Sequence, residues 1–367
     1  TFTPDSGLPL YGGKAKYYNE ISLSNQGLKG EGSFEFHNSY AKANILFLPD
    51  STNLVTSSFK ISEVTSGIEF PEVYNTETYA TYYKLDDQLD IRMKDEPFDF
   101  YNSNATFYGN LFMKPAELTG EGIMKLEKVE VSADVFKYNA NWFDSENSSL
   151  QFFDNQGNIA VTADNLRSHI DLEMRDAVFY SNNSDNSKFN FPANQYICRK
   201  FNNCTWNMDK EYFKISIEDS IKGFAEFIST HKDQESLNFF AKSANYSLTD
   251  YIINAQGVES IHIADAIIYP DSGLLNVQKD AVISTLSSAT VELTKYNHIF
   301  SNSTVDILSK NSYNATGTFL LSYGLNNTKE LFFEKILVNN DNTTEAYGQL
   351  DSDRPFSIHS KLDLKGK

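Results

Sequence analysis

Apolar and polar residues alternate along most of the chain, which is the pattern of β-strands with one buried face. The alternation is clear in Tyr17–Leu23, Ala41–Leu48, Asn158–Asp164 and Ile170–Met174. Turn-forming residues such as Pro49-Asp50-Ser51 separate the strands, which follow one another at intervals of about 8 to 12 residues. The pattern predicts an all-β chain, folded as a sandwich, a barrel or a solenoid.

One stretch, residues 215–229, also fits a short amphipathic helix. Ile217, Ile221 and Phe224 recur there at helical spacing. Gly223 lies in the middle of the stretch, where it would destabilise a helix, and the flanking sequence is typical of strands. The sequence therefore leaves one short helix open as an alternative to further strands.

An internal repeat narrows the architecture. The stretch Leu28–Ala43 returns as Leu118–Ala133 at an offset of 90 residues (118 − 28), and both copies join a Leu-x-Gly-x-Gly phrase to an alanine-centred strand. Such a unit cannot bury its own apolar face, so we expect stacked β-repeats, as a solenoid or open β-roll. The glycines of the phrase are Gly30, Gly32, Gly120 and Gly122.

We expect these four glycines where strands turn a corner or where backbones approach closely. A phosphate-binding loop is excluded, because the phrase lacks a third glycine and a following helix, and because it recurs. Ser57-Ser58 returns as Ser148-Ser149 at an offset of 91 (148 − 57), and an insertion in a turn would explain the additional residue.

Three regions follow from the distribution of these features. Residues 1–153 hold both copies of the unit, 154–230 form a β region with a polar loop and two cysteines, and 231–367 resume β-repeats continuous with the preceding region. The chain begins at Thr1 without a methionine, so we expect a segment cut from a longer protein.

The excess of acidic over basic residues restricts the kinds of partner that the chain can bind. Its formal net charge of −18 repels phosphate backbones, and no Lys/Arg-rich stripe offsets this, so we expect no nucleic-acid partner. No apolar run reaches the roughly 20 residues that a membrane-spanning helix needs.

The two cysteines, Cys198 and Cys204, lie close together in the sequence. A tight turn between two strands would bring them to bonding distance in an oxidising compartment, and two free buried thiols are the alternative. Two thiols without a histidine nearby do not form a zinc site, so we expect no metal.

Motifs of known catalytic chemistry are absent from the sequence. The six histidines include no pair with a metalloprotease spacing, and no nucleophile elbow, Walker loop or dinucleotide fingerprint occurs. Nothing in the spacing of Asp86, Asp87, Asp90, Asp351 or Asp353 selects a catalytic or calcium-binding pair. We therefore expect neither a cofactor nor enzymatic activity, and we interpret His262 and His298, in alternating strands, as structural.

Aromatic and acidic residues are concentrated between Glu69 and Asn110. The pattern predicts strands with a solvated acidic face, and a carbohydrate-binding aromatic surface near Tyr79–Tyr108 is the alternative.

The sequence resembles two known protein families. The Leu-x-Gly-x-Gly phrase, together with Ile159–Asp164 and Leu237–Gly257, resembles in repeat style the periplasmic lipopolysaccharide-bridge (organic-solvent-tolerance) family. The stretches Phe191–Cys198, Thr205–Lys210 and Ile263–Gly273, with the first repeat, resemble a family of very long cell-envelope proteins of Bacteroidetes bacteria. The second resemblance implies an internal segment of a larger, exported envelope protein, in the periplasm or at the outer membrane, and brings no catalytic residue.

The function that we expect is a non-enzymatic, structural or scaffolding β-repeat segment, in contact with other segments of a longer chain or with envelope proteins. A lipid- or lipopolysaccharide-conducting β-roll is the alternative, and a glycan-binding module is a third. In a lipid bridge, apolar members of the repeat would line an open groove. These members are Phe34, Phe36, Met124 and Leu126.

Overall fold

The computed structural model describes residues 3–183, 186–210, 212–217, 223–295, 297–323, 327–348, 356–359 and 362–364. The chain divides into two compact units, Thr1–Asn182 and Asn183–Lys367. The boundary thus differs from the boundaries at 153/154 and 230/231 that the sequence suggested. A division after Phe153 is prevented because Trp142–Phe153 and Ile159–Asp171 pair with each other as neighbouring strands.

The first unit consists of fifteen strands and one 3-10 turn. They are β1 (Leu8–Leu10), η1 (Tyr11–Gly13), β2 (Ala15–Ser24), β3 (Gly27–Phe36), β4 (Ser39–Phe47), β5 (Ser51–Ile61), β6 (Val73–Asn75), β7 (Thr78–Tyr83), β8 (Gln88–Met93), β9 (Phe98–Phe100), β10 (Ala105–Lys114), β11 (Glu117–Lys125), β12 (Val129–Tyr138), β13 (Trp142–Phe153), β14 (Ile159–Asp171) and β15 (Asp176–Ser181).

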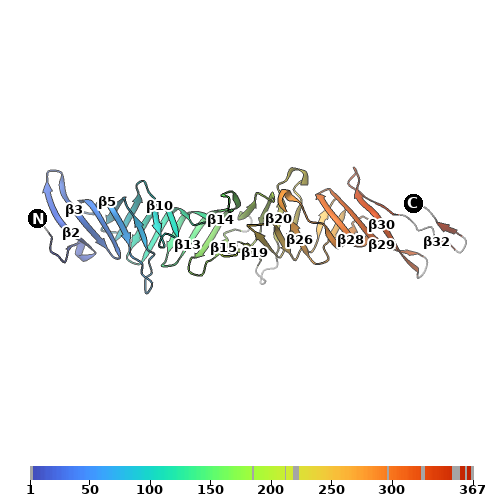
Figure 1. The fold of residues 1–367 in the computed structure, drawn as a ribbon, viewed down its shortest axis with the longest axis horizontal. Coiled ribbons are helices and arrows are strands. Elements are labelled where there is room, and N and C mark those ends of the chain that lie inside the picture. The colour runs from blue at the N-terminus through green and yellow to red at the C-terminus, as the bar shows by residue number, and fades with distance from the viewer. Residues whose placement is uncertain are drawn as a thin grey trace. The chain divides into compact units, whose positions relative to one another are not determined.

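Strands of the first unit pair with their neighbours in the chain, always antiparallel, as the blue-to-green part of Figure 1 shows. β5 pairs with both β6 and β7, and β10 pairs with both β8 and β9. Each of these short pairs therefore acts as one strand interrupted near its middle.

The interruptions belong to a line of bends that crosses the long strands of this unit. Asn19 in β2, Gly122 in β11 and Asn147 in β13 have positive φ angles of 103°, 147° and 52°. The β4–β5 ladder shifts register at Lys42/Ala43, where Ser57 is an additional residue. Bulges and positive φ angles bend strands, so the long strands change direction at this line.

The core of the first unit is aromatic, because inward positions of successive strands carry phenylalanine and tyrosine. Phe107 and Phe136 lie with ring centroids 5.6 Å apart, and both contact Tyr138 at 5.8 Å. All three side chains are buried. Edge-to-face and stacked rings at these distances stabilise a core beyond the burial of their area.

The second unit contains the remaining strands and two 3-10 turns. They are β16 (Lys188–Phe191), β17 (Tyr196–Arg199), β18 (Asn203–Asn207), β19 (Tyr212–Ser216), β20 (Ala225–Ser229), η2 (Lys232–Gln234), β21 (Asn238–Ala241), β22 (Ser243–Ser247), β23 (Ile253–Gln256), β24 (Ile261–Ile263), β25 (Ala266–Tyr269), β26 (Leu274–Val277), η3 (Lys279–Ala281), β27 (Leu286–Leu293), β28 (His298–Ser309), β29 (Ser312–Tyr323), β30 (Asn327–Val338), β31 (Thr344–Tyr347), β32 (Phe356–His359) and β33 (Leu362–Leu364).

Short strands stack in two series in the second unit. β16, β17, β20 and β21 pair in one series, and β18, β19, β22, β23 and β26 pair in the other. Phe191 of the first series contacts Tyr246 of the second, with ring centroids 4.7 Å apart, so the two series face each other. β24, β25 and β27–β31 form a further antiparallel sheet.

The predicted all-β, stacked-repeat fold is confirmed. The alternative of a helix over 215–229 is not: Ile215 and Ser216 end β19, and 225–229 form β20, while 218–222 lie outside the described residues. Buried positions alternate in β19, as in a strand with one buried face. Ile217 and Phe224 lie outside both strands, and Ile221 lies outside the described residues.

The sequence repeat is a structural repeat. Its first copy forms β3 and β4 and its second copy forms β11 and β12, and Gly32 pairs with Ala43 as Gly122 pairs with Ala133. The offset of 91 residues between Ser57-Ser58 and Ser148-Ser149 does not come from an insertion in a turn, as the sequence suggested. Phe47 pairs with Thr52, and Tyr138 pairs with Phe143, so the two turns have equal length. The additional residue lies inside β12, at the bulge opposite Gly120/Gly122.

Candidate functional site

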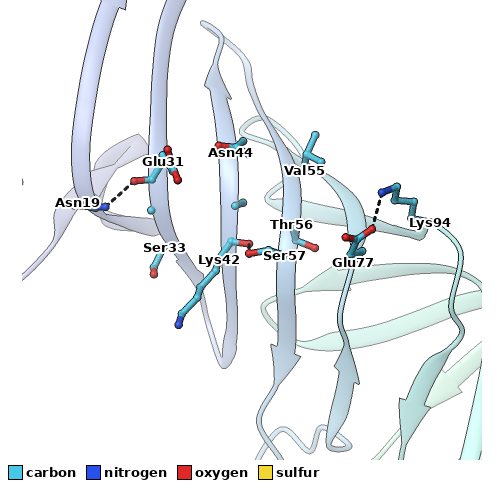
Figure 2. A pocket seen from close by; sticks show the side chains of 12 residues that line it. Asn19, Glu31, Ser33, Lys42, Asn44, Val55, Thr56, Ser57, Glu77 and Lys94 are labelled. Carbon is cyan, nitrogen blue, oxygen red and sulfur yellow. Dashed lines mark hydrogen bonds and ion pairs between the residues drawn. The ribbon is translucent and has the colours of Figure 1, made fainter.

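A groove crosses the exposed face of the first unit where its strands bend, and Figure 2 shows its lining. It encloses about 480 Å³. Its side chains come from β2, β3, β4 and β5, from the break between β6 and β7, and from the residue that follows β8. The lining residues are Asn19, Glu31, Gly32, Ser33, Lys42, Ala43, Asn44, Val55, Thr56, Ser57, Glu77 and Lys94.

The alternation of each strand places the polar lining outward. In β4, Ala41, Ala43 and Ile45 are buried, whereas Lys42 and Asn44 between them are exposed. The backbone approaches closely at the floor, because a Cβ on Gly32 would collide with the carbonyl oxygen of Tyr18. The groove therefore lies along the bend, where glycine and alanine leave no side chain that could fill it.

Hydroxyl groups inside the bend satisfy backbone groups that the interrupted ladder leaves without partners. The buried Thr56 Oγ1 accepts a hydrogen bond from the Thr78 backbone N–H at 2.7 Å and lies 2.9 Å from Thr78 Oγ1. In β13, Ser148 Oγ donates to the carbonyl oxygen of Leu166 at 3.0 Å. These contacts hold the strands in the bent geometry on which the groove depends.

The charges in the groove are balanced. Lys94 Nζ lies 2.6 Å from Glu77 Oε2, and this hydrogen bond and charge raise the pKa of Lys94. Lys42 and Glu31 supply one further charge of each sign, and neither side chain has an ion-pair partner in the described part of the chain. The groove thus presents two ammonium and two carboxylate groups.

A row of exposed side chains extends from the groove across further strands. Each member lies directly opposite the next in the antiparallel ladders. The row consists of Glu31, Asn44, Val55, Tyr79, Arg92, Asn110 and Glu121, and we call it the outer row. Directly opposed side chains on neighbouring strands are within contact distance, so the outer row is a continuous surface.

A smaller hollow of about 310 Å³ lies on the same unit, lined by Glu72, Tyr74, Asp99, Asn102 and Ser103. Ser103 Oγ donates to Asp99 Oδ2 at 2.7 Å, and Lys60 lies 2.7 Å from Glu72. One carboxylate oxygen of Asp99 and one of Glu72 are thus engaged in local contacts, whereas the buried Asp99 Oδ1 has no hydrogen-bond partner within the described residues.

The four glycines do not lie in the turns between strands, but Gly32, opposite Asn19, and Gly122 lie on the line where the long strands bend. All four lie inside β3 and β11. The expectation of close approach is correct: a Cβ on Gly122 would collide with the carbonyl oxygen of Tyr108, and Gly30 and Gly120 face the hydroxyls of Tyr17 and Tyr138.

The apolar members of the repeat do not line an open groove. Phe34 and Phe36 are 1% and 0% exposed, and their rings lie 6.0 and 5.1 Å from that of Tyr82. Met124 is 0% exposed. Leu126 follows β11 and is half-buried. Phe34, Phe36 and Met124 thus belong to the inward face of the sheet and fill the core, where an acyl chain cannot contact them.

Cys198 in β17 and Cys204 in β18 are free, buried thiols, which is the second of the two alternatives that the sequence left open. β17 pairs with β16 and β20, whereas β18 pairs with β19, so the turn between the cysteines does not close a hairpin. Burial raises the pKa of both thiols, and the neighbouring Cys198 raises the pKa of Cys204 further. Both groups are therefore protonated and poorly nucleophilic.

Groups that could support catalysis are dispersed. His169 Nδ1 lies 2.8 Å from Asp144 Oδ1, whereas Asp87 accepts a hydrogen bond from Tyr82. His262 and His298 lie in β24 and β28. Within the described ranges, no three His, Cys, Asp or Glu side chains are placed to hold a metal, and no helix has the length and hydropathy to cross a membrane. Asp351 and Asp353 lie outside the described residues.

The aromatic region divides between the core and the surface. Tyr82, Phe98, Phe100, Tyr101 and Phe107 are buried. Tyr79, Tyr83 and Tyr108 are 48%, 38% and 38% exposed.

Sequence reasoning missed most of the groove, because its residues meet only through strand pairing. The exposed member of each alternation in β3, β4 and β5 was the available signal, but a charge at such a position is typical of any solvated strand. Comparison of the chain with protein-family models, with curated proteins and with solved structures gave no match.

Proposed function

We propose that this chain is a structural segment of an exported bacterial cell-envelope protein, in which bent β-hairpins are repeated to build a rigid support. The observation that carries the proposal is the repeated pairing of Gly32 with Ala43 and of Gly122 with Ala133 at the bend. A unit that reproduces its strand register after 90 residues is suited to extending a stack, and repeat proteins use such units as scaffolds.

The placement in the envelope rests on the sequence resemblance to long envelope proteins of Bacteroidetes. The partners proposed with it are other segments of a longer chain and neighbouring envelope proteins. The lipid-conducting alternative has less support, because Phe34, Phe36 and Met124 are packed into the core.

The test is a deletion strain of the organism that makes the protein, complemented with variants. Cell fractionation with an antibody against the first unit should place the protein in the envelope fraction. Loss of the gene should increase permeability to a dye that an intact envelope excludes. The unaltered chain should restore exclusion, whereas Gly122→Val, which disrupts the bend, should not.

Two further variants separate a structural role from a chemical one. His169→Phe removes the His–carboxylate contact, and Lys214→Ala alters an exposed strand residue of the second unit. Both should restore dye exclusion if the role is structural. A folded His169→Phe protein that fails to restore exclusion, or a protein found in the cytosolic fraction, would contradict the proposal.

A further inference from the structure

The groove and the outer row form one surface on the first unit. Glu31, Asn44 and Val55 belong to both, and Tyr79 lies directly opposite Val55 in the β5–β7 ladder. Tyr79 lies directly opposite Arg92 in the β7–β8 ladder, and Lys94, which lines the groove, follows Arg92 by two residues. A ligand lying across the strands would contact both features.

The charges of this surface favour an uncharged ligand. Two lysines and two glutamates cancel within the groove, and Glu77 and Lys94 neutralise each other directly at 2.6 Å. The chain as a whole carries a net charge of −18, which disfavours a polyanion.

The hydrogen-bonding groups of the groove belong mainly to side chains, because the backbone at its floor is already paired. Gly32 pairs with Ala43, and Ala43 pairs with Thr56, so the floor offers no free strand edge to a peptide. Asn44, Lys42 and Ser57 provide an amide, an ammonium and a hydroxyl at exposed positions. Toward hydroxyl groups, the ammonium donates and the amide both donates and accepts. The Ser57 hydroxyl, which already donates to the Lys42 carbonyl oxygen at 3.4 Å, accepts.

An exposed aromatic ring completes the surface. Tyr79 is 48% exposed, and Val55 beside it is exposed to the same extent. A tyrosine ring is stabilised by burial against another group, so this ring is available to a ligand. Flat apolar area beside convergent polar groups matches a sugar ring, which has an apolar face and a rim of hydroxyls.

We propose that the groove and the outer row bind a neutral polysaccharide chain lying across the strands, with Tyr79 stacked on a sugar ring and Lys42, Asn44 and Ser57 bonded to its hydroxyls. This inference does not rest on the structural role proposed above, because binding is tested with the isolated chain. Strands lie about 4.8 Å apart, so successive members of the row would meet successive parts of an extended polymer.

Affinity gel electrophoresis of the full chain tests the inference. The gels contain dextran, galactomannan or yeast mannan as neutral probes, and alginate or polygalacturonate as acidic probes. We expect at least one neutral polysaccharide to retard the chain and the acidic ones to leave its mobility unchanged. Tyr79→Ala should weaken the retardation about tenfold, the effect of truncating a central aromatic contact.

Matched variants separate binding from folding. Tyr83→Ala removes an exposed tyrosine from the same strand outside the row, and should bind like the unaltered chain. Ser57→Trp fills the groove and should abolish retardation, whereas Asn53→Trp, on the same face of β5 outside the groove, should not. Circular dichroism establishes that each variant is folded.

The inference is overturned if no neutral probe retards the chain, or if only the acidic probes do. It is also overturned if Ser57→Trp and Tyr79→Ala, both folded, are retarded as strongly as the unaltered chain. Loss of envelope integrity without any glycan binding would leave the structural role standing and remove this inference alone.

Discussion

Gly122 lies directly opposite Ala133 in the β11–β12 ladder, at the position where the ladder shifts register. The same strand faces Gly109 on its other side, and a Cβ on Gly122 would meet the Gly109 Cα and the carbonyl oxygen of Tyr108. Three strands therefore approach each other here more closely than side chains allow. Gly32, between Asn19 and Ala43, repeats the arrangement.

Substitution of these glycines should destabilise the first unit. Gly32→Ala places a Cβ against the Tyr18 carbonyl oxygen, and Gly122→Ala adds an unfavourable φ of 147°. We expect each to lower the free energy of unfolding by about 3 kcal/mol, measured by urea denaturation. Ser33→Ala, one residue away, is the control and should change it by less than about 0.5 kcal/mol. Equal effects at positions 32 and 33 would contradict the close approach.

The hydroxyl of Thr56 should be worth more than that of an exposed threonine. Thr56→Val keeps the shape of the side chain but leaves the buried Thr78 N–H without its acceptor. An unsatisfied buried donor costs about 1–3 kcal/mol, so the urea midpoint should fall accordingly. Thr81→Val, at a half-exposed position of β7, should leave the midpoint nearly unchanged. A tolerated Thr56→Val would mean that the bend does not need this contact.

Stability should fall in alkali. Burial raises the pKa of Tyr101 and Tyr138 well above the ordinary value, and raises that of Tyr313 to about 12. Unfolded tyrosines ionise near pH 10, so above that pH the unfolded chain releases protons that the folded chain retains. The contribution of these phenols to the free energy of unfolding should therefore be fully present below about pH 9 and should be lost as the pH rises through about 10.

Denaturant melts at a series of pH values measure this loss. Tyr138→Phe removes one of the responsible groups, and the Tyr138 hydroxyl has no hydrogen-bond partner within the described residues. The variant should be at least as stable as the unaltered chain at neutral pH and should lose less stability in alkali. A pH-independent free energy of unfolding would refute the buried state of these phenols.

The two thiols should be inaccessible in the folded chain. Cys198 and Cys204 are both 0% exposed, and their raised pKa values keep them protonated. A chromogenic disulfide reagent at about pH 8 should react with neither cysteine until urea is added, and then with both. Rapid labelling of the native chain would contradict the burial, and failure to react in urea would indicate a disulfide.

Sequence alternation was sufficient to place many strands, because a half-buried strand shows its two faces locally. Tyr17–Leu23 lies within β2, and Ala41–Leu48 nearly coincides with β4. The repeat identified Gly32 and Gly122 as special positions. The repeat did not show that both glycines lie inside strands. The reason for glycine there is a carbonyl oxygen of the neighbouring strand, which the local sequence does not reveal.

The groove could not be predicted for a related reason. Lys42, Ser57 and Glu77 are distant in the sequence, and they line one surface because β3, β4, β5 and β7 pair in a particular register. A shift of one residue in any of these ladders would turn its side chains to the other face. Register depends on packing of the whole sheet, which local alternation does not encode.

The pairing of β10 through β15 with their immediate neighbours also determines how the first unit can fold. Contacts between adjacent strands are close in the sequence, and topologies rich in such contacts fold faster than those that must join distant segments. A chain that emerges gradually from a ribosome or a narrow channel can therefore form each hairpin once its second strand is free. The growing sheet then serves as the template for the next strand.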